Sequence, residues 1–119
     1  MATEEEREVI VRDAIRFLAG ERDEGAENAH NSVDTGDAVE TMWLIAEIAR
    51  RSSGVTDPIN IGIGLLDAAI WRYAAAHPEE VADAIVGSTR LIQALPYVRG
   101  LSRYPELMAR LPVGLTGDT

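Results

Sequence analysis

The chain has 119 residues, of which 46% are hydrophobic, so it is long enough to bury the core of one domain. It contains no cysteine, which excludes disulfides, a thiolate nucleophile and a cysteine-ligated zinc site. The net charge is -9, which disfavours binding to nucleic acid through a clustered basic surface.

The ends and the apolar runs of the sequence show no pattern typical of export or membrane insertion. The N-terminal sequence MATEEEREVI is acidic, whereas a secretory signal begins with a basic region. No run approaches the roughly 18 apolar residues of a membrane-spanning helix. We therefore expect a cytoplasmic protein with no membrane partner. Lysine is absent and alanine abundant, which fits a GC-rich, bacterial coding sequence.

Capping residues and apolar spacing predict the first elements of the chain. The sequence TEEE has capping-box spacing, so a helix is predicted from there to about Leu18, with a stop at Gly20. Residues 21–35 are polar and acidic without a sustained apolar period, and we predict a loop with at most one helical turn. The next helix is predicted to begin near Gly36 or Asp37 and to end at RRSSG. Its centre, MWLI, is apolar on every side, which places it in the middle of the bundle.

The segment DPINIGIGLLDAAIWRYAAAH has features of both a strand and a helix. INIGI alternates as a strand does, but Asp57 and Pro58 form a typical helix start. Five large side chains share one helical stripe, so a helix is predicted: Ile59, Ile63, Leu66, Ile70 and Tyr73. Gly62 and Gly64 cost about 1 kcal/mol each inside a helix, and close approach of a neighbouring helix is the expected reason for them.

The remaining sequence completes an all-α fold. HPEEVADAIVGSTRLIQAL is predicted as one helix that starts at Pro78, and the tail after it contains short helical pieces, the clearest over 105–111. We therefore predict a compact bundle of four main helices plus a short C-terminal helical segment. Residues 1–119 are expected to form a single helical domain.

The segment NSVDTGDAVE, residues 31–40, has two interpretations. In the first it is a helix N-cap: Asp34 or Thr35 accepts backbone N–H groups, Gly36 allows the turn, and acidic residues follow at the positive end of the helix dipole. In the second, NSVDT before an amphipathic helix resembles acyl or peptidyl carrier proteins, in which Asp-Ser-Leu precedes a helix. This resemblance covers about the first 70 residues and implies that Ser32 carries phosphopantetheine. Asn31 and Val33 depart from the carrier pattern, and the N-cap is our leading interpretation.

Residues with catalytic or metal-binding chemistry are few. There is no Ser-His-Asp pattern, nucleophile elbow or phosphate-binding glycine loop, and the chain has two histidines as its neutral-range bases. The acidic segment does not meet the EF-hand register, and the Glu27–His30 spacing occurs once where a di-iron bundle needs it twice. We therefore expect no catalytic residue, no metal site and no cofactor, and we lean towards a protein that is not an enzyme.

A small-ligand site is the one pocket that the sequence suggests. Asp67 lies within an apolar helix, near Trp71 on the same side. Such a carboxylate is usually paired or exposed, but in a cleft it could be an acid–base group with a raised pKa. A ligand would lie between Trp43, Trp71 and the glycine-bearing helix, with Asp67 pointing inward.

The tail ALPYVRGLSRYPELMARLP is the best candidate for an interaction surface, because it is locally basic and combines residue types enriched at interfaces. The candidate residues are Tyr97, Arg99, Arg103, Tyr104, Met108 and Arg110. The alternative is that the tail packs its own apolar side chains over the bundle. Residues 1–50 carry thirteen acids against five arginines, so the tail of one copy also complements the acidic half of another.

These observations lead to two predicted functions. The first is a non-enzymatic protein–protein interaction module: an adaptor, an inhibitor-like binder or a self-assembling subunit of a homo-oligomer. Its partner would be another protein or a second copy of the chain, and not nucleic acid. The alternative is a carrier-like or small-ligand-binding helical bundle.

Overall fold

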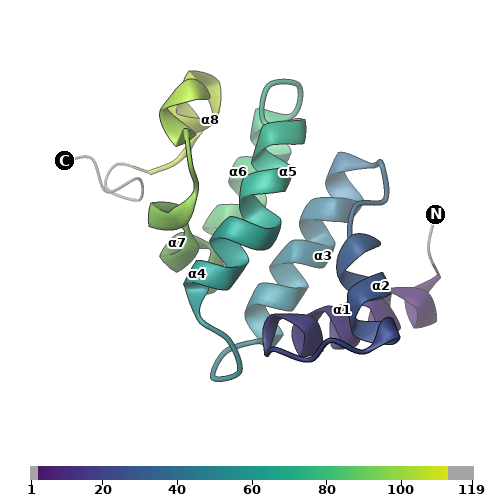
Figure 1. Cartoon of the computed structure of the whole chain (residues 1–119). Coiled ribbons are helices and arrows are strands. Elements are labelled where there is room, and N and C mark those ends of the chain that lie inside the picture. Colours follow the sequence, from purple (N-terminus) through teal and green to yellow (C-terminus); the bar gives the residue numbers. More distant parts are fainter. Residues whose placement is uncertain (1–2, 113–119) are drawn as a thin grey trace.

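Helices form all of the regular secondary structure in residues 3–112, the part of the chain that the computed structural model describes (Figure 1). The α-helices are α1 (Glu4–Leu18), α2 (Glu24–Asn31), α3 (Ala38–Arg51), α4 (Pro58–Ile61), α5 (Asp67–Tyr73), α6 (Pro78–Val86), α7 (Thr89–Ala94) and α8 (Pro105–Arg110). A π-helical turn, η1 (Gly62–Leu66), joins α4 to α5, and η2 (Leu95–Tyr97) and η3 (Leu101–Arg103) are 3-10 turns. The all-α class is confirmed, whereas the division into four main helices and one short segment is wrong. Within residues 3–112 no helix has both the length and the apolar character that crossing a membrane requires.

α1 begins and ends as its sequence predicts. The Thr3 hydroxyl accepts a hydrogen bond from the Glu6 backbone N–H at 3.1 Å, which satisfies one of the unpaired donors of the first turn. The helix ends at Leu18, and Gly20 supplies the left-handed conformation of the following turn, with φ of 106°.

α2 is the largest departure from the sequence prediction, which placed a loop over residues 21–35. The Asp23 carboxylate caps this helix by accepting the Ala26 N–H at 2.8 Å. The residues that α2 buries are two alanines, Ala26 and Ala29, and the helix packs on α1. Two alanines give too little hydrophobic contrast to reveal a helical period, so contact with α1 and the cap stabilise a helix that the pattern does not show.

The start of α3 is confirmed near Asp37, but the identity of the capping residue was wrong. Asp37, and not Asp34 or Thr35, caps the helix, because its Oδ1 atom accepts two backbone N–H groups at 2.9 and 3.2 Å. The turn at Gly36, with φ of 81°, separates Asp34 from the helix start and leaves its carboxylate to contact α5.

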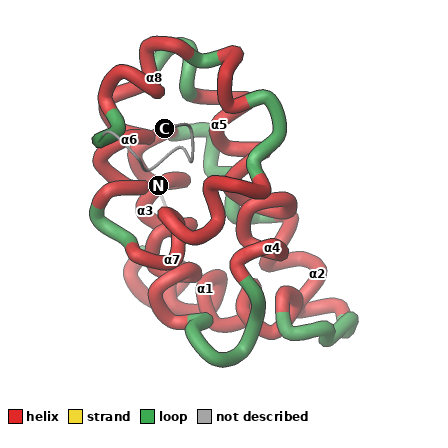
Figure 2. Tube along the Cα trace, turned by 90° about the vertical axis from the view of Figure 1, so that its left-hand side faces the viewer, coloured by secondary structure: helices red, strands yellow, loops and turns green. Residues whose placement is uncertain are grey.

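The core lies around α3, which contacts α1, α5, α6 and α7. As predicted, the centre of α3 is in the middle of the bundle, although Trp43 is exposed. The largest fully buried side chains come from both halves of the chain: Val11, Met42, Leu44, Ile45, Ile48, Ile61, Leu66, Ile70, Ile85, Leu91, Leu95 and Leu107. Figure 2 shows that the connections between the helices are short loops.

Residues 58–73 form one continuous helical rod, made of α4, η1 and α5. The preference for a helix over a strand is confirmed, and the predicted apolar stripe is only partly buried. Of the five residues, Leu66, Ile70 and Tyr73 are buried. Ile59 and Ile63 are 41% and 50% exposed. The π turn inserts one extra residue, so the buried side shifts by one position and includes Ile61 in place of the two exposed isoleucines.

The two glycines of η1 have different surroundings. A Cβ atom on Gly62 would lie 2.7 Å from the carbonyl oxygen of Ala94 and 3.0 Å from Cβ of Tyr97. A Cβ atom on Gly64 would meet Cε1 of His30 at 3.6 Å, which is an ordinary contact. The prediction of close helix approach is therefore confirmed for Gly62 and wrong for Gly64.

The helix predicted over residues 78–95 is divided into α6 and α7. Ser88 has an extended backbone between them, and its hydroxyl accepts the Leu91 N–H at 3.3 Å as the N-cap of α7. Serine competes for backbone groups in this way at helix starts, so Gly87 and Ser88 break the helix despite the continuous apolar spacing. The short helix predicted over 105–111 is confirmed as α8.

Candidate functional site

A groove of about 1080 Å³ follows the exposed side of η1 and α5, and we call it the central groove. Figure 1 shows the rod of α4 and α5 in front, with α7 and α8 on one side and the N-terminal helices on the other. The groove is lined by His30, Asn31, Val33, Asp34, Thr41, Ile45, Ile63, Gly64, Leu65, Asp67, Ala68, Ala69, Trp71, Arg72, Tyr73, Arg99, Gly100 and Arg103. It thus collects polar, apolar and charged side chains from four separate stretches of the chain.

Large apolar side chains are exposed along this rod. Ile59, Ile63, Asp67 and Trp71 recur every four residues, so they share one side of the helix, and we call them the Trp71 stripe. Trp71 is 70% exposed and Asp67 is half-buried. The π turn accounts for this exposure, because it directs the buried side of the rod away from the stripe. Asp67 and Trp71 therefore line one groove, as the sequence suggests.

Two arginines of the tail border the same groove. Arg99 and Arg103 are exposed, and neither forms an ion pair within residues 3–112. Gly100, in the left-handed conformation with φ of 69°, turns the chain between them. A Cβ atom there would lie 3.3 Å from Cδ of Arg103, so the Arg103 side chain folds back over the turn.

The other predicted interaction residues of the tail divide into two groups. Tyr97 and Arg110 are exposed. Tyr104 is half-buried and packs against the core, and Met108 is half-buried on α8. The tail therefore combines both interpretations of its sequence: part of it packs on the bundle, while Arg99 and Arg103 face a groove.

Asp34 anchors one wall of the central groove to α5. Its Oδ1 atom accepts the Tyr73 hydroxyl at 2.6 Å and the Gly36 N–H at 2.9 Å, and its Oδ2 atom pairs with Arg72. Burial by itself raises the pKa of Asp34, but the hydroxyl, the backbone N–H and the guanidinium outweigh it, and the pKa is lowered. The loop between α2 and α3 is thereby fixed to the rod.

Replacing Asp34 by alanine is expected to lower the free energy of unfolding by about 1–2 kcal/mol at neutral pH, mostly through the lost Tyr73 bond. The Arg72 pair adds little, because the Asp34 side chain is 34% exposed. Since the folded-state pKa lies below the ordinary 3.8, this contribution is present above pH 3.8 and is lost as the pH falls through the folded value.

Urea unfolding of the wild type and D34A between pH 7 and about pH 2 measures this loss. D57A is the matched control, because Asp57 makes no side-chain capping bond at the start of α4. A D34A effect that stays constant down to the lowest pH would contradict the assignment.

His30 is held in the wall of the groove as a neutral packing group. Its ring stacks on Phe17, with centroids 4.1 Å apart and planes at 21°, and the Arg22 guanidinium lies 4.0 Å from the Phe17 centroid. Burial lowers the pKa of His30, and the charge of Arg22 lowers it further. Its Nδ1 atom is buried without a hydrogen-bond partner among the described residues.

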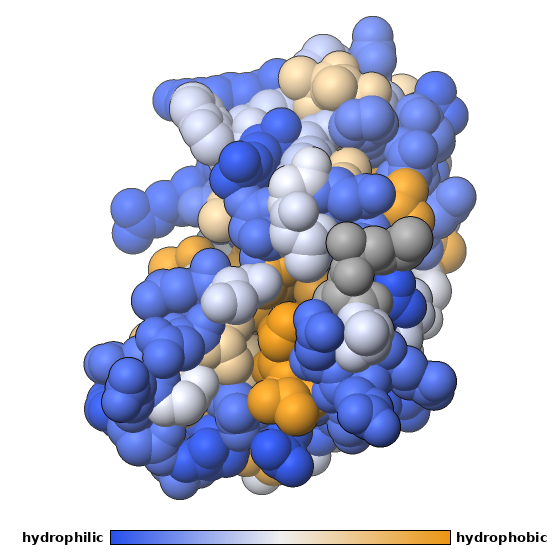
Figure 3. Space-filling view, turned by 90° about the vertical axis from the view of Figure 1, so that its right-hand side faces the viewer, coloured by the Kyte–Doolittle hydropathy of each residue, from blue (hydrophilic) through white to orange (hydrophobic). Residues whose placement is uncertain are grey.

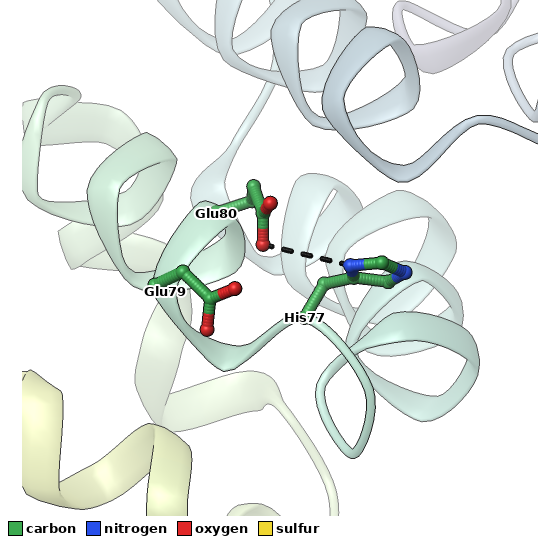
Figure 4. Close-up of side chains that lie close together, drawn as sticks. All are labelled: His77, Glu79 and Glu80. Atoms are coloured by element: carbon green, nitrogen blue, oxygen red, sulfur yellow. Dashed lines mark ion pairs between the residues drawn. The ribbon is translucent and has the colours of Figure 1, made fainter.

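Sequence reasoning missed a cluster of His77, Glu79 and Glu80 (Figure 4). Their ligand atoms lie within 4.8 Å of one another, and His77 Nδ1 is 3.7 Å from Glu80 Oε2. Both carboxylates belong to the first turn of α6, where the helix dipole stabilises negative charge and opposes a cation. The pKa of Glu79 is lowered by its own backbone N–H, then by Glu80, with a smaller effect from Arg110. The helix terminus accounts for the carboxylates, and we assign no metal to them.

Ser32 and Trp43 lie outside the central groove. Ser32 is exposed at the C-cap of α2, so it follows a helix, and α3 starts only at Ala38. In the carrier pattern the serine immediately precedes a helix, and phosphopantetheine attachment here stays a prediction. Trp43 is exposed on α3 beneath Arg7, whose Cζ atom lies 5.5 Å from the ring centroid. The structure therefore does not bring Trp43 to Trp71.

A second, smaller groove of about 580 Å³ lies between α1 and α2, and we call it the α1–α2 groove. Its lining combines apolar and acidic side chains with small residues: Glu5, Glu6, Val9, Ile10, Asp13, Gly25, Asn28, Ala29 and Ser32. Figure 3 views the side of the molecule that carries the N-terminal helices and shows hydrophobic surface in a hollow between hydrophilic lobes.

Comparisons of this chain with protein families, with curated proteins and with solved structures find no match. The two grooves and the side chains that border them are therefore the features of the chain that bear on its function.

Proposed function

We propose that the protein is a non-enzymatic protein-interaction module that binds its partner through the Trp71 stripe and the adjacent arginines. One observation carries this proposal: Trp71, Ile63 and Ile59 are exposed on one side of a rod, beside Arg99 and Arg103. Exposed apolar patches bordered by polar residues are typical of binding surfaces, and tryptophan and arginine are enriched among the residues that dominate binding energy.

The alternative of a small-ligand site has weaker support. Asp67 and Trp71 line the central groove, but Trp43 does not, and the indole of Trp71 is mostly in water. Ligand pockets usually bury most of the ligand between apolar walls, whereas this groove has charged residues along both sides. We therefore place this function second.

A double substitution, I63S/W71A, tests the proposal. In affinity capture from cells that express the chain, some proteins are retained by the wild type. We expect the retained amount of these partner proteins to be lower with the variant, on the order of tenfold or more, because both apolar anchors are lost. V86S is the matched control, since Val86 is similarly exposed on α6 but outside both grooves. Quantitative mass spectrometry gives the readout, and an unchanged set of retained proteins would overturn the proposal.

A further inference from the structure

We infer that the partner of the Trp71 stripe is a second copy of this chain, which offers its α1–α2 groove. This inference rests on the proposed function and adds the identity of the partner and its contact surface. The contact joins two different surfaces of the molecule, one on each copy.

The α1–α2 groove has the apolar floor that the stripe requires. Val9 is exposed and Ile10 half-buried on α1, and Ala29 contributes from α2. The stripe presents Ile63 and Trp71, so association would remove apolar side chains of both copies from water, which is the main favourable contribution to such contacts.

Each surface is bordered by two charges that are unpaired among the described residues, and the two pairs are opposite in sign. Of the other acidic residues, Asp13 in the groove pairs with Arg16, and Asp67 belongs to the stripe itself. Glu5 and Glu6 line the α1–α2 groove, are exposed, and form no ion pair with any residue between 3 and 112. Arg99 and Arg103 line the central groove beside the stripe, and they too are exposed and form no ion pair within residues 3–112. The two glutamates of one copy can thus pair with the two arginines of another. Such opposite charges raise the rate at which two copies associate and fix how they are oriented in the contact.

The wider charge distribution favours the same pairing. Residues 4–31 contain nine acids and four arginines, a net charge of -5, whereas residues 97–110 contain three arginines and one glutamate, a net charge of +2. An acidic chain of net charge -9 repels its own copies in most orientations. The orientation that brings the basic tail to the acidic helices is the one in which this repulsion is reversed.

Both surfaces can be occupied at once, because the two groove linings share no residue. The contact is therefore head-to-tail, and its repetition gives a ring if the rotation closes and a chain of copies if it does not. A two-fold contact centred on either surface would instead place like charges of the same patch opposite one another.

Two charge-reversal variants test this arrangement: E5R/E6R changes the groove and R99E/R103E changes the border of the stripe. By sedimentation velocity at about 50 mM NaCl, the wild type is expected to associate as the protein concentration rises. At about 500 mM NaCl the association should be weaker, because salt screens the charges. Each variant alone is expected to associate on the order of tenfold more weakly. An equimolar mixture of the two should regain association, because each keeps the surface that the other lacks.

A wild type that stays monomeric, or variants that associate as the wild type does, would overturn the inference. Association lost in both variants and not regained on mixing would also overturn it, because that result indicates a contact other than head-to-tail. Circular dichroism melts of each variant separate lost association from lost folding. If the wild type is monomeric while I63S/W71A still loses a captured protein, the interaction function stands and the second copy is excluded as its partner.

Discussion

Replacing Gly62 by alanine is expected to lower the free energy of unfolding by about 2–4 kcal/mol. The added Cβ atom would lie 2.7 Å from the Ala94 carbonyl oxygen, and a backbone atom cannot rotate away as a side chain can. The rod and the end of α7 must therefore separate, which weakens the packing of the buried Leu91 and Leu95. Equilibrium unfolding in urea measures the change.

G64A is the matched control within the same π turn. Gly64 is exposed, and its Cβ position meets a single ring atom of His30 at 3.6 Å. Without a clash, alanine should raise the free energy of unfolding by up to about 1 kcal/mol, because it restricts the unfolded chain and favours the helix. Equal losses in both variants would contradict the close contact at Gly62 and indicate that any side chain disturbs this turn.

The contact at Gly62 also positions the candidate site. Its second neighbour is Cβ of Tyr97, at 3.0 Å, and the chain reaches Arg99 two residues later. Displacement of η2 would move the arginines relative to the Trp71 stripe. G62A is therefore expected to weaken partner binding, measured by the same affinity capture, as well as stability.

Helix starts were the part of this fold that the sequence predicted best. Thr3, Pro58, Pro78 and Pro105 each lie at the beginning of a helix, and each acts through bonds or dihedral limits within one turn. Such local signals do not depend on what packs against the helix. These helices therefore begin in the structure where the sequence predicts.

The errors came from features that the apolar spacing of the sequence does not show. α2 depends on its contact with α1, and the exposure of Ile59 and Ile63 depends on the extra residue that the π turn inserts. A period of 3.6 residues counted through that turn assigns the wrong side of the rod to the core. Ile59 and Ile63 were consequently placed on one stripe with Leu66 and Ile70, which are buried.

The sequence predicted several residues of the candidate site, but it did not predict how they are arranged in space. Asp67 and Trp71 share a helix, so their common side follows from spacing alone. Their proximity to Arg99 and Arg103 depends on the path of η2 and on the turn at Gly100. Nothing in the local sequence fixes that path, and Trp43 lies on another surface.

Replacing Arg7 by methionine is expected to lower the free energy of unfolding by about 2–4 kcal/mol, because it leaves a buried carboxylate without its partner. Arg7 Nε donates to Glu40 Oε1 at 2.7 Å, and the Glu40 side chain is 7% exposed whereas that of Arg7 is 31% exposed. Methionine keeps the apolar stem of arginine over Trp43, so the loss reports mainly on the charge. Urea unfolding at neutral pH is the measurement.

The same pair predicts an asymmetry that separates the cost of an unpaired charge from the value of the ion pair. E40L should lower the free energy of unfolding much less than R7M does. The Arg7 side chain is 31% exposed, so water can hydrate its guanidinium once Glu40 is gone. The double variant R7M/E40L should return to within about 1 kcal/mol of the wild type, because two apolar side chains can replace a buried pair. R50M is the control: Arg50 is 66% exposed and pairs with Glu47 at 2.8 Å, and Arg51 also pairs with Glu47 at 3.0 Å, so R50M should lower the free energy of unfolding by less than about 0.5 kcal/mol. If the effects of R7M and E40L simply add in the double variant, Glu40 is not held by the charge of Arg7, and this pair does not contribute to joining α1 to α3.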